Sequence, residues 1–358
     1  MNEARALTTH TKHETQPAEL LQPLYVAVIG CGRIADSHLA AIAAQPEIAR
    51  LVAVADSDSA RAAAAAERFG AAHCYTDLAD VLALAEVEAV ILCTPNAVHT
   101  SQTLQALAAR KHVLVEKPMA ENAAAAETMQ RAAETAGRVL AIGHTFRHCD
   151  AVRYLQDHRA EFGRLRAIEV SQCVFWDGPQ APWWATRAPE DGLILSLFAP
   201  HALDFVQLVM GDDPLRVHVE AARFQGGWRG EDEAMIVLAY PDRRMATLHL
   251  SYNQRQIVDR KTLFFDRGVL RIEDGESLFW NDALLVPPGG TNIADARRMG
   301  GRDLSGYFCT QLREFTRAVR GLPNRSTLQD EGRRLIALID RIRQSARANS
   351  AAMIDGPF

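Results

Sequence analysis

The sequence predicts an α/β protein of two domains: a doubly wound parallel sheet, followed by an α+β domain with a large, mostly antiparallel open sheet. Between residues 25 and 146, short β-branched runs alternate with alanine-rich helical runs, which indicates parallel strands joined by helical crossovers. From residue 147 to 358, longer strand-like runs are separated by tight turns, which is typical of antiparallel strands. The length of 358 residues also exceeds one ordinary hydrophobic core, so two domains are expected.

The first 24 residues precede both domains. They are polar and mixed in charge, without the apolar core and small-residue cleavage site of a signal peptide. We interpret residues 1–24 as a flexible tail, in preference to an arm that contacts another subunit.

Composition excludes several classes of partner. The chain is 48% hydrophobic with a net charge of −5, and it has no long Lys/Arg run. We therefore expect no nucleic-acid partner and no anionic membrane surface, and no stretch is long and uncharged enough to span a bilayer. The six cysteines are scattered without a CxxC pair, so we expect no metal site and no disulfide framework. A cytoplasmic location fits this use of cysteine.

Each element of the first domain follows from its local pattern. Runs rich in Val, Ile and Leu predict strands at 25–30, 51–56, 89–94, 112–118 and 138–143. Alanine-rich runs predict helices at 35–45, 59–70, 100–110 and 121–137, the second of them closed by Gly70.

The elements of the second domain are predicted from the same kind of local pattern. Alternating runs predict strands at 165–176, 215–226, 234–240, 244–253, 261–274 and 277–288. The tail from 307 to 349 returns to a helical pattern.

The strongest local motif is "VAVIGCGRIADSH", which carries Gly30, Gly32 and Ala35 in the spacing GxGxxA between a strand and a helix. Gly30 permits a tight turn, Gly32 lets the backbone approach a pyrophosphate, and Ala35 lets the helix pack closely on the strand. The helix N-terminus then offers amide donors to the phosphates. We interpret the motif as a dinucleotide-binding loop, in preference to a structural glycine turn.

Asp56, at the end of the second strand, bears on the choice of cofactor. Its carboxylate can accept hydrogen bonds from both ribose hydroxyls of an adenosine, and it would repel a 2′-phosphate. Asp58 adds negative charge nearby, whereas Arg61 is a cation within reach. NAD is therefore favoured over NADP. The alternative role for Asp56, as N-cap of the following helix, is compatible with the same position.

Two further segments end strands on the same edge of the parallel sheet: "CTPNAVH" (93–99) and "VEKPMA" (115–120). Ligands of doubly wound folds bind at the carboxyl ends of the strands, so Lys117 lies where a nicotinamide and a substrate would meet. A lysine at a strand end is often only a solvated charge. The apolar strand, the preceding Glu116 and the following proline, which can set an unusual peptide geometry, favour a role in a site.

These segments, together with the later "GLILSLFAPHALD" (192–204), resemble the Gfo/Idh/MocA family of sugar and polyol oxidoreductases. The resemblance extends from about residue 25 to the C-terminal helices. It implies an N-terminal Rossmann domain and an α+β domain whose open sheet supports the substrate pocket and often the subunit contact. A homodimer or homotetramer is expected on that ground alone.

The resemblance implies roles for matching residues. Lys117 matches the active-site lysine, which bonds the reacting hydroxyl and assists proton transfer. A base of suitable pKa is needed because loss of hydride from an alcohol carbon must be matched by loss of the hydroxyl proton. Arg147, in "GHTFRH", resembles an arginine that contacts substrate. The positions expected at the cofactor are Gly30, Gly32, Arg33, Ile34, Asp56, Thr94, Pro95, Asn96, His99 and Glu116.

The segment "GLILSLFAPHALDF" (192–205) departs from the family pattern. The family has an aspartate one helical turn before a histidine that matches His201, and here Leu197 occupies that position. Since residues four apart share a helix face, Leu197 is expected beside His201. We interpret His201 as a pocket residue acting with Lys117, rather than a buried core histidine, and Asp204 as a structural partner. A leucine at 197 cannot accept a proton.

We therefore predict an NAD-dependent dehydrogenase or reductase of a sugar, polyol or sugar derivative, with Lys117 and His201 as catalytic residues. Trp184, in the "PWWATR" stretch (182–187), is expected at the substrate, although tryptophans in a loop are as often plain packing. Because Leu197 replaces the acid, a less hydroxylated or keto substrate is an alternative. A cofactor-binding sensor or assembly protein with little turnover is a second alternative.

Overall fold

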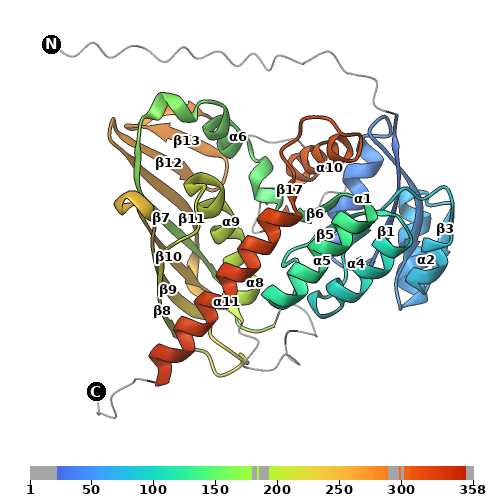
Figure 1. The fold of residues 1–358 in the computed structure, drawn as a ribbon, viewed down its shortest axis with the longest axis horizontal. Helices are drawn as coiled ribbons and strands as arrows, with labels where there is room; N and C mark the ends of the chain where they lie inside the picture. Colours follow the sequence, from blue (N-terminus) through green and yellow to red (C-terminus); the bar gives the residue numbers. More distant parts are fainter. Residues whose placement is uncertain (1–21, 180–183, 185–192, 289–297, 300–301, 352–358) are drawn as a thin grey trace.

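The computed structural model describes residues 22–179, 184, 193–288, 298–299 and 302–351. In this part of the chain, two large sheets lie on opposite sides of the molecule with helices between them (Figure 1). The first sheet has seven strands in the order β17-β6-β5-β4-β1-β2-β3, and the second has eight in the order β14-β13-β12-β11-β7-β10-β9-β8. The predicted fold class is confirmed.

The first sheet is parallel except at one edge, where β17 runs antiparallel to β6. Its central strands β1 and β4 are buried apart from Tyr25 of β1, because helices cover both faces. The strands are β1 (Leu24–Ile29), β2 (Ala49–Ala55), β3 (His73–Tyr75), β4 (Ala89–Leu92), β5 (His112–Glu116), β6 (Leu140–Gly143) and β17 (Thr327–Leu328). The helices that follow them are α1 (Ala35–Ala44), α2 (Ser59–Phe69), α3 (Leu78–Leu82), α4 (His99–Ala108) and α5 (Ala123–Ala136).

The ends of α2 show how local chemistry sets these helices. Asp58 caps its N-terminus by accepting hydrogen bonds from the amides of Ala60 and Arg61. Gly70 ends it in the left-handed conformation (φ +72°), which confirms the predicted closure. The cap is therefore Asp58 and not Asp56.

The second sheet is mostly antiparallel, as predicted, with one parallel pair formed by β7 and β10. Its strands are β7 (Leu165–Phe175), β8 (Arg216–Ala222), β9 (Glu233–Ala239), β10 (Met245–Ser251), β11 (Asn253–Phe265), β12 (Val269–Glu273), β13 (Ser277–Trp280) and β14 (Ala283–Val286). A separate pair joins β15 (Arg298–Met299) to β16 (Arg302–Asp303). The short 3-10 helices among the described residues are η1 (Asn96–Val98), η2 (Thr145–His148), η3 (Arg159–Phe162) and η5 (Pro241–Arg243).

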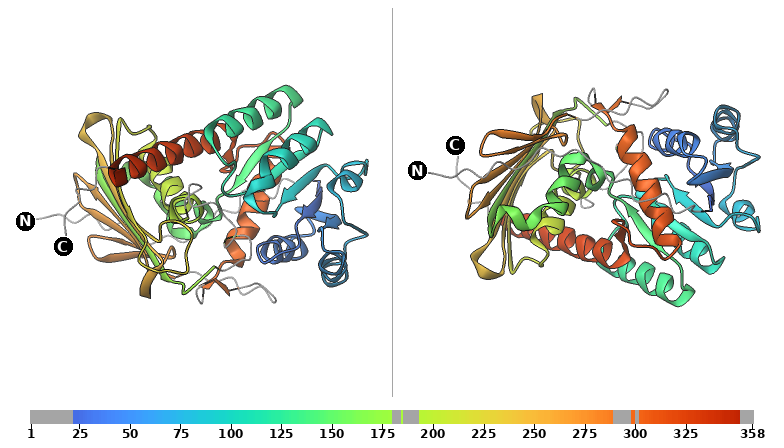
Figure 2. Two further views of the ribbon diagram at one scale, coloured as in Figure 1. Left: turned by 90° about the horizontal axis from the view of Figure 1, so that it is seen from below. Right: turned by 90° about the horizontal axis from the view of Figure 1, so that it is seen from above.

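One face of the second sheet packs on helices and the other is open. Along β9, Ile236 and Leu238 are buried, whereas Met235 and Val237 on the opposite face are 52% and 44% exposed. Figure 2 shows helices packed on the inner face of the second sheet, on the side toward the first sheet. These helices are α6 (Asp150–Asp157), α8 (Ile194–Leu197), α9 (Ala199–Met210) and part of α11 (Gln329–Ala351).

The C-terminal tail is not one helix, because β17 separates α10 (Ser305–Val319) from α11. Phe308, Leu312 and Phe315 of α10 join the core of the first sheet. The tail of the predicted second domain thus also contributes to the first sheet and its core. The predicted boundaries themselves stay predictions.

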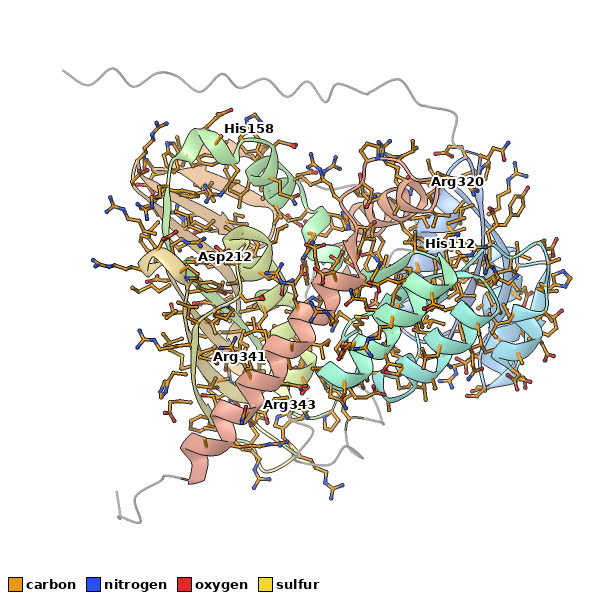
Figure 3. The ribbon with its side chains drawn as sticks, viewed as in Figure 1. His112, His158, Asp212, Arg320, Arg341 and Arg343 are labelled. Atoms are coloured by element: carbon orange, nitrogen blue, oxygen red, sulfur yellow. The ribbon has the colours of Figure 1, made fainter. Side chains whose placement is uncertain are left out.

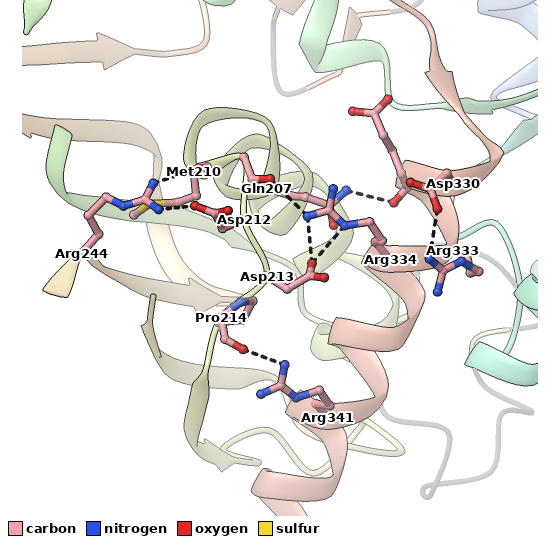
Figure 4. A network of polar contacts seen from close by, with 12 residues as sticks. Gln207, Met210, Asp212, Asp213, Pro214, Arg244, Asp330, Arg333, Arg334 and Arg341 are labelled. Atoms are coloured by element: carbon pink, nitrogen blue, oxygen red, sulfur yellow. Dashed lines mark hydrogen bonds and ion pairs between the residues drawn. The ribbon is translucent and has the colours of Figure 1, made fainter. Parts of the chain in front are cut away.

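Helix α11 crosses from one sheet to the other and is fixed by arginines. Arg334 pairs with Asp213 (3.0 Å), and Arg341 donates to the carbonyl of Pro214 (2.8 Å), both in the segment between α9 and β8 (Figure 4). Further along, Arg343 donates to the Glu121 carbonyl of the first domain (3.2 Å; Figure 3). The helix therefore holds both domains around the cleft described next.

Candidate active site

The loop between β1 and α1 carries two glycines, of which Gly30 is required by the backbone and Gly32 leaves open space. Gly30 adopts φ +86°, and a Cβ there would lie 2.9 Å from the carbonyl carbon and oxygen of Cys93. Gly32 has nothing within 4 Å of a Cβ position, so its backbone faces open space in which a ligand can approach. Ile34 is the N-cap of α1, and Arg33 is exposed beside it. This geometry fits a pyrophosphate at the helix N-terminus.

Asp56 lies at the carboxyl end of β2, beside this loop. Its carboxylate accepts hydrogen bonds from the amides of Cys31 (2.8 Å) and Asp58 (2.9 Å). Arg61 reaches it with an N–O distance of 3.1 Å, although the arginine side chain is 56% exposed. The carboxylate is thus fixed at the place where an adenosine ribose is expected.

The "CTPNAVH" segment follows β4 on the same sheet edge. Pro95 precedes η1, and Asn96 is buried at its start. Thr94 donates from its hydroxyl to Gln102 (2.5 Å). His99 lies with Nδ1 2.8 Å from the Pro118 carbonyl and Nε2 2.8 Å from the Thr94 carbonyl. His99 therefore links the strand-end loops of β4 and β5, and its contact with the cofactor stays a prediction.

Glu116 ends β5 and is buried. It accepts a hydrogen bond from His38 Nε2 of α1 (2.9 Å) and another from the Lys117 amide (3.1 Å). Burial acts to raise the pKa of Glu116, but the contacts with His38 and Lys117 outweigh it and lower that pKa. Glu116 is therefore a buried carboxylate beside the cleft. His38 is not among the site residues that the sequence predicts.

Lys117 reaches across to the second domain. Its Nζ donates to the backbone carbonyl of Leu197 (3.1 Å), and the Lys117–Pro118 peptide is cis. Burial lowers the pKa of Lys117, and the charge of Arg33 adds to this, whereas Glu116 opposes it. The side chain thus connects the carboxyl edge of the first sheet with the predicted substrate helix.

The helix predicted to carry both Leu197 and His201 is interrupted between them. Pro200 has no amide hydrogen for a helical bond to Ser196, and the helix breaks into α8 and α9 at Phe198. His201 donates its amide to the Phe198 carbonyl (3.2 Å), so the Leu197 carbonyl is left for Lys117. The Leu197 side chain is 6% exposed and belongs to the hydrophobic core.

Two histidines lie near Lys117. His201 packs edge-on against Phe146 with ring centroids 4.8 Å apart, and its buried Nδ1 has no hydrogen-bond partner among the described residues. Burial lowers its pKa well below the ordinary value, and the charge of Lys117 acts in the same direction. His144, which follows β6 beside the end of β5, also has a buried and unpartnered Nε2 within the described chain. Burial lowers its pKa too.

Arg147 is held by protein partners. It forms two contacts of 2.8 Å with the carboxylate of Asp204 and one of 2.9 Å with Glu331. Arg147 is 5% exposed and Asp204 is 3% exposed. The structural role inferred for Asp204 agrees with this pairing, whereas substrate contact by Arg147 stays a prediction.

Trp184 belongs to an aromatic cluster at the end of β7 and β10. It lies 5.4 Å from Trp176 and 6.3 Å from Trp228 between ring centroids, and it is 8% exposed. Tyr252 and Phe198 complete the cluster, so it adjoins the break between α8 and α9. Substrate contact by Trp184 stays a prediction, and the rest of the "PWWATR" stretch lies outside the described residues.

A cavity of about 80 Å³ lies beside the loops that follow β4 and β5. It is bounded by η1, the loop after Lys117, α8 and α11, with lining residues Asn96, Ala97, Pro118, Ala120, Glu121, Ser196, Ile336, Ile339 and Arg343. A second, much smaller hollow lies behind His201, beside Arg147, Asp204 and Lys261. Of the residues chosen from sequence, Asn96 lines the first cavity, and Arg147 and His201 line the second. Sequence reasoning missed His38, His144 and Phe146, although all three stand in motifs that it quoted.

The described residues contain neither a group of side chains suited to a metal ion nor a membrane-spanning helix. No group of three or more His, Cys, Asp or Glu side chains there is placed to hold a metal ion. None of the helices in that part of the chain combines the length and apolar character needed to cross a membrane.

Comparison with known proteins identifies both domains. Residues 24–144 match a family model described as an oxidoreductase family with an NAD-binding Rossmann fold. Residues 155–271 match the model of the GFO/IDH/MocA C-terminal domain. The two models together cover most of the chain.

Two of the relatives with assigned names carry the names of carbohydrate enzymes. The chain is 28% identical over 313 residues to 1,5-anhydro-D-fructose reductase of Ensifer adhaerens, which is 85% of this chain and 91% of the relative. It is 39% identical over 206 residues to D-glucoside 3-dehydrogenase of Escherichia coli, covering 57% of this chain and 58% of that enzyme.

Solved structures show the same fold. A levoglucosan dehydrogenase in complex with NADH and L-sorbose superposes with a TM-score of 0.81 at 19% identity, covering 91% of this chain and 97% of the other. An oxidoreductase from Agrobacterium radiobacter in complex with NAD+, L-tartaric acid and magnesium gives 0.82 at 20% identity, covering 92% and 97%.

Proposed function

This chain belongs to the Gfo/Idh/MocA family of oxidoreductases and carries its NAD-binding domain, and we propose that it moves hydride between NAD and a hydroxyl or carbonyl carbon of a sugar, polyol or sugar derivative. The observation that carries this proposal is the position of Lys117. Its amine lies at the carboxyl edge of the dinucleotide-binding sheet and contacts the second domain at Leu197. The names of the relatives support a carbohydrate-like substrate.

Lys117 is the proposed acid and base. In oxidation, the substrate O–H proton passes to the neutral Lys117 amine while the C–H bond gives up hydride and a C=O bond forms. In reduction, the ammonium returns that proton to the carbonyl oxygen. NAD, when bound, accepts the hydride in one direction and supplies it in the other. Burial lowers the pKa of Lys117, so the neutral amine forms more readily than in an exposed lysine.

His201 is the proposed partner at the reacting oxygen. Because burial lowers its pKa, the ring is neutral and can donate one hydrogen bond while accepting another. We propose that it holds the substrate oxygen opposite Lys117. This role is separate from that of Arg147, which its carboxylate partners already occupy.

The break at Phe198 gives Lys117 a neutral partner in place of a carboxylate. A backbone carbonyl accepts a hydrogen bond without adding negative charge, whereas an aspartate would raise the pKa of a neighbouring lysine. The Leu197 side chain also offers no acceptor to a substrate hydroxyl, whereas an aspartate at this position would. A keto substrate, or one with fewer hydroxyls, is therefore the second candidate.

A panel experiment tests the function. Purified protein is incubated with NAD+ and a range of sugars and polyols, and with NADH and the matching keto compounds, while NADH absorbance is followed. Turnover of carbohydrates supports the proposal, and turnover of keto compounds alone selects the second candidate. Binding of NAD without turnover across the panel contradicts it and favours a sensor.

We also propose that the open face of the second sheet joins subunits into a homodimer or homotetramer. That face exposes Phe175, Met235, Val237 and Met245, an apolar surface typical of subunit contacts. Light scattering measures the mass directly. A dimer that Val237→Lys converts to a monomer supports this contact, and a monomeric wild-type protein contradicts it.

A further inference from the structure

Glu231, in the loop between β8 and β9, holds the N-terminal end of α8 through three successive amides. Its Oε1 accepts hydrogen bonds from the Leu193 amide (2.8 Å) and the Leu195 amide (3.1 Å). Its backbone carbonyl accepts a third, from the amide of Ile194 (3.1 Å). One residue from a distant segment therefore satisfies the amides of a whole helical turn.

Helix α8 depends on this external cap. It has only four residues, and the amides at the start of a helix have no partners within it. Leu193, at the N-cap position, has no side chain that could accept them. At the other end of the same turn, the carbonyl of Leu197 accepts the hydrogen bond from Lys117 Nζ. Glu231 and Lys117 thus hold opposite ends of one helical turn.

The neighbours of Glu231 serve other elements. The Asp232 carboxylate accepts hydrogen bonds from the amides of Phe224 and Gln225, and Glu233 bonds His249 and Ser251. Among these hydrogen bonds of the consecutive acids 231–233, those to α8 are made by Glu231. Burial raises its pKa against the opposing effect of the amides, and Arg343 lies near enough to influence it.

We propose that Glu231 is a positioning residue for the reaction: it fixes α8 so that the Leu197 carbonyl holds the Lys117 amine at the reacting oxygen. The inference rests on the proposed function, because the reaction assigned to Lys117 is part of it. Displacement of a catalytic group by about 1 Å can lower a rate by about 10²-fold. Loss of the Glu231 side chain should therefore slow the chemical step and leave cofactor binding unchanged.

Two Glu231 variants and a matched control test this. Glu231→Ala removes the side-chain acceptor, whereas Glu231→Gln keeps an oxygen at the same reach. Asp77→Ala removes the N-cap of α3, another short helix, where Asp77 accepts from the Ala79 amide. The readouts are kcat and KM on the substrate found by the panel, and the pH dependence of acetic-anhydride labelling of Lys117 by peptide mass spectrometry.

We expect Glu231→Ala to lower kcat by roughly 10- to 100-fold with little change in KM, since the amine is displaced but the pocket remains. The pH at which Lys117 becomes labelled should rise toward that of an ordinary lysine, because water gains access to the amine. Glu231→Gln should stay within about threefold of wild type because its amide oxygen still accepts both bonds. Asp77→Ala should leave kcat and labelling unchanged.

Two results would overturn the proposal: an unchanged kcat and labelling profile in Glu231→Ala, or equal losses in Glu231→Ala and Asp77→Ala. If Glu231→Ala does not fold, Glu231→Asp replaces it, since the shorter side chain withdraws the acceptor and the same outcomes apply. If the panel finds no substrate, the proposed function fails, and the Lys117 labelling profile alone decides the role of Glu231.

Discussion

Replacing Arg147 with methionine should destabilise the protein strongly. The guanidinium and its main partner are both almost fully buried, at 5% and 3% exposure, and two contacts of 2.8 Å join them. Removing the cation leaves the Asp204 carboxylate buried without its partner, which costs about 3–5 kcal/mol in comparable pairs. The Glu331 contact adds little to this value, because that side chain is 36% exposed.

Urea unfolding followed by tryptophan fluorescence measures the change in free energy, and calorimetric titration measures NAD+ affinity. Arg131→Met is the matched control, because Arg131 pairs with Glu127 on the surface and is 73% exposed. We expect the control to change stability by less than about 1 kcal/mol. The double variant Arg147→Met/Asp204→Leu should recover much of the loss, since no unpaired buried charge remains.

The reasoning is refuted if Arg147→Met destabilises the protein no more than the control does. A variant of wild-type stability with a raised KM would instead assign Arg147 to the substrate, as the family resemblance implies. These two outcomes distinguish a structural role for Arg147 from a role in substrate binding.

The remaining predictions concern the cofactor loop and the pH dependence. Gly30→Ala should abolish NAD binding and lower the melting temperature, because its Cβ would lie 2.9 Å from the Cys93 backbone; normal NAD+ affinity would contradict this. Asp56→Ser should weaken NAD+ binding by about tenfold and reduce discrimination against NADP+, through loss of charged hydrogen bonds to the ribose; calorimetry with both nucleotides checks it. For oxidation, kcat/KM should rise with pH as Lys117 loses its proton, with a midpoint below the ordinary lysine value of about 10.4 because burial lowers that pKa; a flat profile would contradict the assigned base.

Much of the first domain follows from sequence because its signals are local. The motif around Gly30 predicts a backbone conformation that only glycine adopts easily, and the structure has φ +86° there. Lys117 was identified from its place at a strand end, and strand ends in a parallel sheet share one edge. The strand periodicity therefore sufficed to place it at the carboxyl edge of the sheet.

Contacts between distant segments could not be predicted in this way. The bond from Arg147 to Glu331 joins residues 184 positions apart, and Glu231 caps a helix 36 to 38 positions before it in the chain. Neither pairing has a periodic or motif signal, because each depends on how separate elements pack. The partners of His99 are backbone carbonyls, which the sequence cannot distinguish from one another.

The interruption of the helix between Leu197 and His201 was not predicted, for a different reason. The family pattern suggests a helix that continues from 197 to 201, and the i, i+4 rule then places the two side chains together. Pro200 was visible in the sequence, and its missing amide hydrogen is what breaks the helix at Phe198. The local rule for proline therefore outweighs the spacing inferred from the family.

Lys117→Met tests the central claim most directly, because it keeps the length of the side chain and removes the amine. Single-turnover formation of NADH from bound NAD+ and substrate reports the chemical step, and titration reports cofactor affinity. We predict a rate lower by about 10²- to 10⁴-fold with NAD+ affinity unchanged. Formation of NADH at the wild-type rate would contradict the assignment of Lys117 as the acid and base.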